Sequence, residues 1–254
     1  FETKSLKHSG TNSCSKNNYM KHIKRGNPSV LFFGRGKCEA SEKVLSHLKQ
    51  CGFEATPVKS KERGEKLPED ILRWDGDYII CFRSFFILPQ NLIDKARVAA
   101  INFHPGPPEY PGNGCINFAL YDECEIYGVT AHIMNKKIDN GKILEVRRFP
   151  VHKDINLPSL LEQTHNELLN MCLDFVTNLA KKNQSFIVDK LQQSENIFWN
   201  GEARKMEELD RLQIVDINVE KPELEKIIKA TCIKGYPPKI IVHGYEFLLN
   251  LKDY

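Results

Sequence analysis

The sequence has no hydrophobic run long enough to cross a membrane, and its first residues do not form a secretory signal peptide. It also has no internal repeats and no low-complexity tracts. The formal net charge is only +3 over 254 residues, which gives no argument for nucleic-acid binding. With 41% hydrophobic and 27% charged residues, the composition is that of an ordinary globular protein. We therefore expect a cytoplasmic protein that contacts neither a membrane nor a nucleic acid.

The cysteines lack the spacing of a zinc site, because no two of the eight form a Cys-x-x-Cys pair. Several stand in apolar segments, as reduced thiols do in the cores of cytosolic proteins. We therefore expect neither a bound metal nor a disulfide framework. The eight cysteines are Cys14, Cys38, Cys51, Cys81, Cys115, Cys124, Cys172 and Cys232.

The most informative stretch is Val98–Gly141. Its first part is an apolar run that ends in Asn102 and His104, and residues two apart in a strand point to the same face. Both side chains would project at the carboxyl end of a buried strand, where open α/β sheets bind ligands. The proline- and glycine-rich segment 105–114 that follows predicts a stiff loop. Asp139 stands in a turn-like Asp-Asn-Gly and could bring a carboxylate back to the imidazole.

The rest of the chain alternates between apolar runs and amphipathic helical patterns, which indicates an α/β fold. Strands are expected at Ser29–Phe33, Glu54–Val58, Asp77–Phe82, Val98–His104, Tyr127–Met134 and Lys142–Phe149. Helices are expected around Val44 to Leu48, around Leu92, Ile93 and Ala96, and at Cys115–Glu123, Leu157–Lys181, Glu202–Leu212 and Pro222–Thr231. The two apolar runs on either side of His243-Gly244 predict a β-hairpin.

These patterns divide the chain into three parts. Residues 1–27 are polar and basic and predict an N-terminal tail, either simply solvated or touching an anionic ligand. Residues 28–193 are expected to form the catalytic domain, and residues 194–254 a small C-terminal subdomain. An exposed edge of the hairpin could pair with a second copy in a homodimer.

Three features carry two interpretations each. The glycine turn after the first strand is a tight strand-to-helix connection, or it lets Arg35 and Lys37 meet a phosphate. The aromatic pair Phe85-Phe86 belongs to the core or to a ligand site. His132 is a packed strand residue, which we favour, or it helps to line the site.

The order Asn102-x-His104-Pro, then a proline/glycine loop, then Asp139-x-Gly141 resembles the folate-dependent formyltransferase family, over roughly Pro28 to Phe149. The resemblance implies a Rossmann-like fold with a mainly parallel sheet flanked by helices. It also implies that Asn102, His104 and Asp139 are the catalytic residues. Many members continue His-Pro-Ser-Leu-Leu-Pro, whereas Gly-Pro-Pro-Glu follows Pro105 here, so the loop contacts to substrate differ.

The same resemblance implies that 10-formyltetrahydrofolate is the co-substrate. Its pterin ring would lie in the loop formed by Phe85, Phe86, Ile87 and Leu88, against apolar walls and backbone groups. The short C-terminal hairpin is similar to that of the nucleotide-sugar N-formyltransferases, so the expected acceptor is the amino group of a nucleotide-linked amino sugar. The alternatives are glycinamide ribonucleotide or methionyl-tRNA as acceptor, or a non-catalytic module that binds folate or nucleotide.

Overall fold

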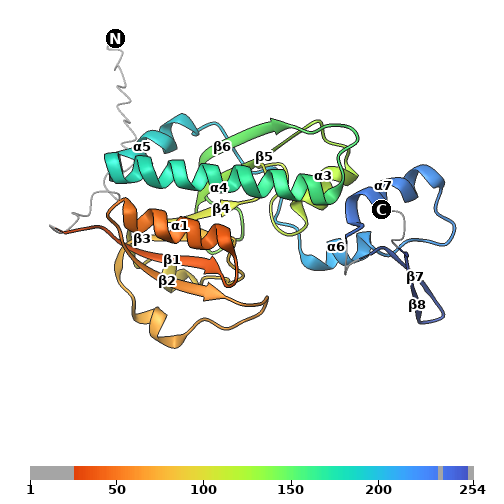
Figure 1. The fold of residues 1–254 in the computed structure, drawn as a ribbon, viewed down its shortest axis with the longest axis horizontal. Helices are drawn as coiled ribbons and strands as arrows, with labels where there is room; N and C mark the ends of the chain where they lie inside the picture. Colours follow the sequence, from red (N-terminus) through yellow and green to blue (C-terminus); the bar gives the residue numbers. More distant parts are fainter. Residues whose placement is uncertain (1–25, 234–236, 251–254) are drawn as a thin grey trace, which may run out of the picture.

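The computed structural model describes residues 26–233 and 237–250 (Figure 1). The predicted N-terminal tail lies, except for its last two residues, outside the described part of the chain, as does Cys14. The first half of the fold alternates strands with helices. Its elements are β1 (Ser29–Arg35), α1 (Glu39–Gln50), β2 (Glu54–Ser60), the 3-10 helix η1 (Glu69–Arg73), β3 (Gly76–Phe82), α2 (Gln90–Ile93) and β4 (Ala96–His104).

The second half completes the sheet and adds the helices that cover it. Its elements are α3 (Cys115–Tyr121), β5 (Ile126–Ile133), β6 (Ile143–Pro150), α4 (Leu157–Lys182), α5 (Gln184–Gln193), α6 (Met206–Leu212), α7 (Lys221–Thr231), β7 (Lys239–Val242) and β8 (Tyr245–Leu248). The order in the main sheet is β2-β1-β3-β4-β5-β6, and β1 to β4 are parallel. In this sheet β5 runs in the direction opposite to the other five strands, so the sheet is mainly parallel and the expected Rossmann-like α/β architecture is confirmed.

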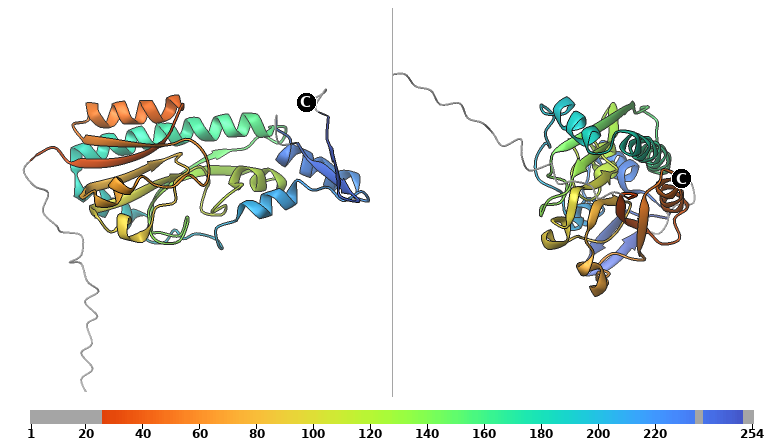
Figure 2. Two further views of the ribbon diagram at one scale, coloured as in Figure 1. Left: turned by 90° about the horizontal axis from the view of Figure 1, so that it is seen from below. Right: turned by 90° about the vertical axis from the view of Figure 1, so that its left-hand side faces the viewer.

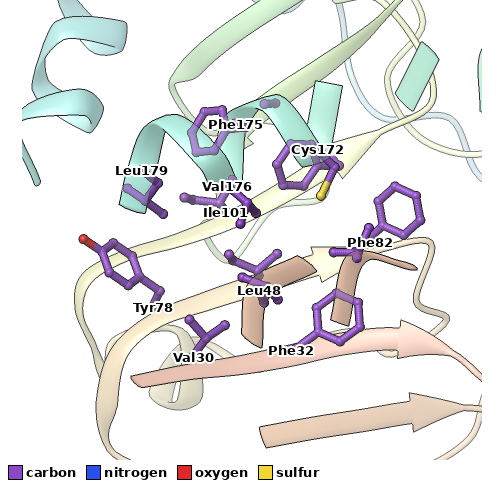
Figure 3. Close-up of a cluster of buried hydrophobic side chains, with 14 of the residues drawn as sticks. Val30, Phe32, Leu48, Tyr78, Phe82, Ile101, Cys172, Phe175, Val176 and Leu179 are labelled. Carbon is purple, nitrogen blue, oxygen red and sulfur yellow. The ribbon is translucent and has the colours of Figure 1, made fainter. Parts of the chain in front are cut away.

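One face of the sheet carries the larger core. Figure 3 shows Val30, Phe32 and Ile101 of the strands facing Leu48 of α1 and Phe175 of α4. All five side chains are at most 1% exposed. Alternation along each strand sends the neighbouring residues to the opposite face, where α2 and η1 cover them. The strands β1, β3 and β4 are therefore largely apolar on both faces, as buried parallel strands are.

The helix at Leu92 is shorter than the sequence pattern predicted. It ends at Ile93, and Ala96 already belongs to β4. The predicted helix Glu202–Leu212 likewise starts only at Met206. The C-terminal elements α6, α7 and the β7–β8 hairpin lie together at one end of the molecule (Figure 2). The predicted hairpin is confirmed, whereas its pairing in a homodimer and the domain boundaries stay predictions.

In the described part of the chain, no helix is both long and apolar enough to span a membrane.

Candidate active site

The three polar side chains singled out in the sequence come from two places in the fold. Asn102 and His104 lie at the carboxyl end of β4, and β5 runs antiparallel beside it with His132 opposite Asn102. Asp139 lies in the connection from β5 to β6, where its backbone has a φ of +41°. Asp and Asn tolerate this left-handed region better than other side chains, which fits the turn-like Asp-Asn-Gly. The turn returns the carboxylate to the end of β4.

The carboxylate of Asp139 is the centre of the cluster. Its Oδ2 lies 3.1 Å from Nδ1 of His104 and accepts the backbone N–H of Gly112 at 2.9 Å. Its Oδ1 accepts a longer hydrogen bond of 3.4 Å from the side-chain amide of Asn102. The structure therefore brings the amide, the imidazole and the carboxylate together, although they are separated by 37 positions in the chain.

Burial and charge act against each other on Asp139, whose side chain is only 7% exposed. Burial alone would raise the pKa of its carboxyl, because it disfavours the charged form. The nearby rings of His104 and His132 and the N–H of Gly112 outweigh burial and hold that pKa well below its usual range. The carboxylate is therefore ionised at neutral pH.

His104 lies between two hydrogen-bond acceptors. Its Nδ1 faces the Asp139 carboxylate, and its Nε2 lies 2.9 Å from the carbonyl oxygen of Tyr110. Burial lowers the pKa of His104, while Asp139 and the Tyr110 carbonyl act in the opposite direction. A neutral imidazole has one N–H and satisfies one acceptor, whereas an imidazolium satisfies both. When the His104 ring is protonated, each of its two N–H groups therefore has a hydrogen-bond acceptor already in place.

Glycine is required next to this imidazole. A Cβ atom at Gly106 would lie 2.6 Å from Nε2 of His104 and 3.0 Å from the carbonyl oxygen of Tyr110. Gly112, which donates to Asp139, has a φ of +87°, a conformation that favours glycine. The proline- and glycine-rich loop therefore needs glycine at these two positions, because it passes close to the imidazole and the carboxylate.

Two residues that the sequence did not assign to the site contact it. His132 is 2% exposed, and its Nε2 lies 3.1 Å from the Asn102 amide nitrogen and 3.2 Å from Oδ1 of Asp139. It is packed, as predicted, but it also belongs to the cluster. The ring of Trp199 packs edge-on against His104 and His132, with centroids 5.7 and 5.0 Å apart. Its indole N–H donates to the carbonyl of Gly141 at 2.7 Å. From the sequence, a role of His132 in lining the site was the less favoured of two interpretations, and no pattern indicated Trp199.

The cluster opens into a pocket of about 490 Å³. Its lining includes all four residues of the cluster and three arginines: Asn102, His104, His132, Asp139, Arg35, Arg63 and Arg83. Lys37, which was paired with Arg35 as a phosphate contact, is not among its lining residues. A larger hollow of about 750 Å³ lies beside α7 and includes none of the cluster. The described residues include no group of three metal-ligating side chains suited to a metal ion.

The loop Phe85 to Leu88 also lines this pocket, but its side chains differ in position. Phe86 and Leu88 are buried in the second core cluster, 9% and 6% exposed, whereas Ile87 is 75% exposed. Phe85 is half-buried. Within the described part of the chain, the backbone N–H groups of Ile87 and Leu88 donate no hydrogen bond. The loop thus offers backbone donors above an apolar wall.

The sequence can now be placed among known proteins. Residues 9–175 match the formyl transferase family, so the chain belongs to this family, and formyl transfer is the reaction that membership supports. A methionyl-tRNA formyltransferase of Thermodesulfovibrio yellowstonii is 25% identical over 87% of this chain and 76% of its own length. The matched regions cover only 45% and 44% of the next two curated relatives.

Solved structures share the fold at low sequence identity. A sugar N-formyltransferase from Shewanella sp. superposes with a TM-score of 0.66 at 15% identity, covering 88% of this chain and 96% of that one. An N-formyltransferase from Helicobacter canadensis, in complex with folinic acid and dTDP-3-aminofucose, has a TM-score of 0.57 at 14% identity, covering 85% and 84%. At these identities the likeness establishes the fold alone.

Proposed function

We propose that the protein transfers the formyl group of 10-formyltetrahydrofolate to the amino group of a nucleotide-linked amino sugar, with Asn102, His104 and Asp139 as catalytic residues. The observation that carries this proposal is that Asn102 and His104 both lie within 3.4 Å of the Asp139 carboxylate and that all three line a single pocket. Formyl transfer between nitrogens needs an oxyanion donor, a proton acceptor and two reactants held at attack distance. The cluster supplies the first two, and the pocket supplies the third.

Asn102 is suited to bind the formyl oxygen. Of the three residues it is the least buried, and its amide hydrogens point to Asp139 at 3.4 Å and to His132 at 3.1 Å. The longer bond is the weaker one, so a formyl oxygen can take its place at little cost. As the amine adds to the formyl carbon, negative charge develops on that oxygen, and the amide donor stabilises it.

Asp139 and His104 are suited to take the proton that the amine must lose. The carboxylate is ionised and buried, and the imidazole next to it has an acceptor at each nitrogen. Protonation of His104 therefore creates an ion pair with Asp139 in a site of low dielectric. His132 and the edge of Trp199 hold the pair in position.

The loop from Phe85 to Leu88 fits the pterin ring of the co-substrate. The buried side chains of Phe86 and Leu88 anchor the loop in the core, and the loop lines the pocket. A flat heterocycle with its own donors and acceptors suits such a surface. This loop would hold the co-substrate, while Asn102 and Asp139 act on the formyl group that it carries.

Methionyl-tRNA is the second candidate acceptor, because curated relatives with significant sequence similarity are methionyl-tRNA formyltransferases. The low formal net charge of +3 gives no argument for an RNA acceptor and favours the smaller one. The similarity of fold to sugar N-formyltransferases over 96% of one of them supports the same choice.

The test is a substrate panel with 10-formyltetrahydrofolate as the donor. Nucleotide-linked amino sugars, glycinamide ribonucleotide and methionyl-tRNA are offered in turn, and release of tetrahydrofolate is followed by absorbance. We expect turnover with an amino sugar, and a loss of about 100-fold or more in His104→Ala. Turnover with methionyl-tRNA alone would disprove the acceptor assignment. If calorimetry shows binding of folinic acid but no amine is formylated, the protein is a binding module.

A further inference from the structure

Three arginines line the same pocket as the Asp139 cluster. Arg35 is the last residue of β1, Arg83 follows β3, and Arg63 stands in the loop after β2. β1 pairs with β3 so that Phe33 lies opposite Cys81, which places Arg35 beside Arg83. The Nε–H of Arg35 donates to the backbone carbonyl of Arg83 at 3.2 Å. The two residues are therefore held together by the sheet itself.

The ring of Phe85 orients two of these guanidinium groups. The guanidinium carbon of Arg35 lies 4.0 Å from the ring centroid, and that of Arg63 lies 5.3 Å from it. Arg63 also donates to the side-chain oxygen of Asn113 at 3.1 Å. Cation–π contacts and a neutral acceptor fix the direction of a guanidinium, but they leave its charge uncompensated.

No carboxylate within residues 26–233 and 237–250 forms an ion pair with any of the three arginines. By contrast, the partly buried Arg97 and Arg147 both have carboxylate partners at 2.7–2.9 Å. Arg83 also has a φ of +56°, and its Nε is a buried donor for which the described residues supply no acceptor. A buried charged donor without an acceptor costs free energy, so a bound anion would stabilise this arrangement.

The positive charge of these arginines also shifts the pKa values of neighbouring groups. Burial lowers the pKa of Arg35, and the neighbouring Arg83 lowers it further. His165 of α4, which lines the same pocket, has a pKa lowered to about 4 by burial and by Arg83 and Arg35. Like charges packed this closely are stabilised when an anion binds between them.

We propose that Arg35, Arg63 and Arg83 form an anion-binding subsite that holds a phosphate or carboxylate group of a substrate whose reacting end lies at Asn102. The proposal rests on the proposed function for the identity of that reacting end. β1, β3 and β4 are neighbours, and adjacent strands lie about 4.8 Å apart. The end of β3 is therefore about 5 Å, and the end of β1 about 10 Å, from the strand that carries Asn102. One extended ligand can therefore contact the arginines and Asn102 at the same time.

Both expected substrates carry suitable oxyanions. A nucleotide-linked sugar has a diphosphate, and the folate co-substrate has the carboxylates of its glutamate. Arginine binds either group through paired N–H donors, and the planar fork of the guanidinium favours such bidentate contacts. The experiment below separates these two sources.

The test measures binding by calorimetry at low salt, with inorganic pyrophosphate and folinic acid as separate probes. The variants are Arg35→Met and Arg83→Met, which keep most of the side-chain volume and remove the charge. Arg73→Met is the matched control, because Arg73 is exposed and lies outside the pocket. We expect each pocket variant to weaken at least one probe by about tenfold or more, and the control to match the wild type.

The outcomes are distinct. Loss of pyrophosphate binding alone assigns the subsite to the phosphates of the acceptor, and loss of folinic acid binding assigns it to the carboxylates of the donor. Wild-type affinity for both probes in folded variants, or no binding of either probe to the wild type, would overturn the proposal. If the variants do not fold, the imidazole of His165 is titrated by NMR in the wild type. Pyrophosphate or folinic acid should raise its midpoint, and an unchanged midpoint with both at high concentration would contradict the subsite.

These measurements contain no acceptor amine and no formyl transfer. Arginine-dependent binding in a protein that formylates nothing would therefore disprove the proposed function and leave the subsite in place.

Discussion

Replacing Asp139 by Asn tests the centre of the candidate site, because the shape is kept and only the charge and one acceptor are lost. In the native site both carboxylate oxygens face donors: Gly112 N–H at 2.9 Å on Oδ2, and the Asn102 amide at 3.4 Å on Oδ1. An amide has one oxygen, so its NH₂ must face a donor in either orientation. The donor left unsatisfied in this buried position costs about 1–3 kcal/mol.

The effect on catalysis should be larger than the effect on folding. Without the carboxylate, protonation of His104 no longer forms an ion pair, and the ring loses the partner that orients it. We expect turnover to fall by about 100- to 1000-fold, the scale seen when one pre-aimed polar group is removed from an active site. Tetrahydrofolate release measures turnover, and urea unfolding measures stability.

The pH dependence of stability gives an independent check. The pKa of Asp139 is depressed in the folded protein, so its contribution is fully present above its unfolded pKa of about 4 and is lost as the pH falls through the depressed value. The Asp139 carboxyl itself does not titrate between about pH 8 and pH 5. Because Asp139 raises the pKa of His104, the stability difference between wild type and Asp139→Asn should instead grow as the pH falls below about 6.5, the unfolded pKa of histidine. Asp94→Asn is the control, because Asp94 is exposed, and it should change stability by less than about 0.5 kcal/mol. An Asp139→Asn enzyme with near-normal turnover would refute the assigned role.

Three further results are expected. Gly106→Ala should lower turnover at least about tenfold and cost about 1–3 kcal/mol of stability, because the added Cβ would lie 2.6 Å from Nε2 of His104; an unchanged rate would show that this imidazole need not keep its position. The Trp74→Phe variant keeps Trp199 as its single tryptophan, and the ring of Trp199 packs against His104. Its fluorescence should therefore fall when His104 is protonated, with a midpoint below about pH 6.5 because burial lowers the pKa of His104. A pH-independent signal would contradict that contact. His165 should titrate near pH 4 by NMR. Because its pKa is lower in the folded protein than in the unfolded chain, this histidine should lower the stability of the protein as the pH falls from about 6.5 toward 4. A titration midpoint near 6.5 would contradict the lowering of its pKa by the nearby arginines.

The family relation followed from one short region of sequence. Asn102 and His104 two apart at a strand end, a proline- and glycine-rich loop and a later Asp139 were enough to predict the fold and the family. The strands were recognisable because their apolar runs are buried on both faces of the sheet, so nearly every residue is constrained. The helix at Leu92 was overextended, because Ala96 fits a helical pattern as well as it fits the start of a buried strand.

The partners of the site residues could not be predicted in the same way. His132 reads as a packed strand residue, and only the antiparallel pairing of β5 with β4 places it opposite Asn102. Trp199 comes from beyond the predicted catalytic domain, and the connection it belongs to is tied to the proline- and glycine-rich loop by backbone hydrogen bonds between Arg204 and Pro111 (3.0 Å) and between Asn113 and Arg204 (2.9 Å). Such contacts have no local signature in the sequence.

The sequence by itself determined the alternation of strands and helices, and it placed an amide, an imidazole and a carboxylate where the chain leaves the sheet, because these properties depend on spacing along the chain. The tertiary structure alone decided which atoms face one another. Strand order put Arg35 beside Arg83, and strand pairing put His132 opposite Asn102, since distances between segments follow from packing rather than from local pattern.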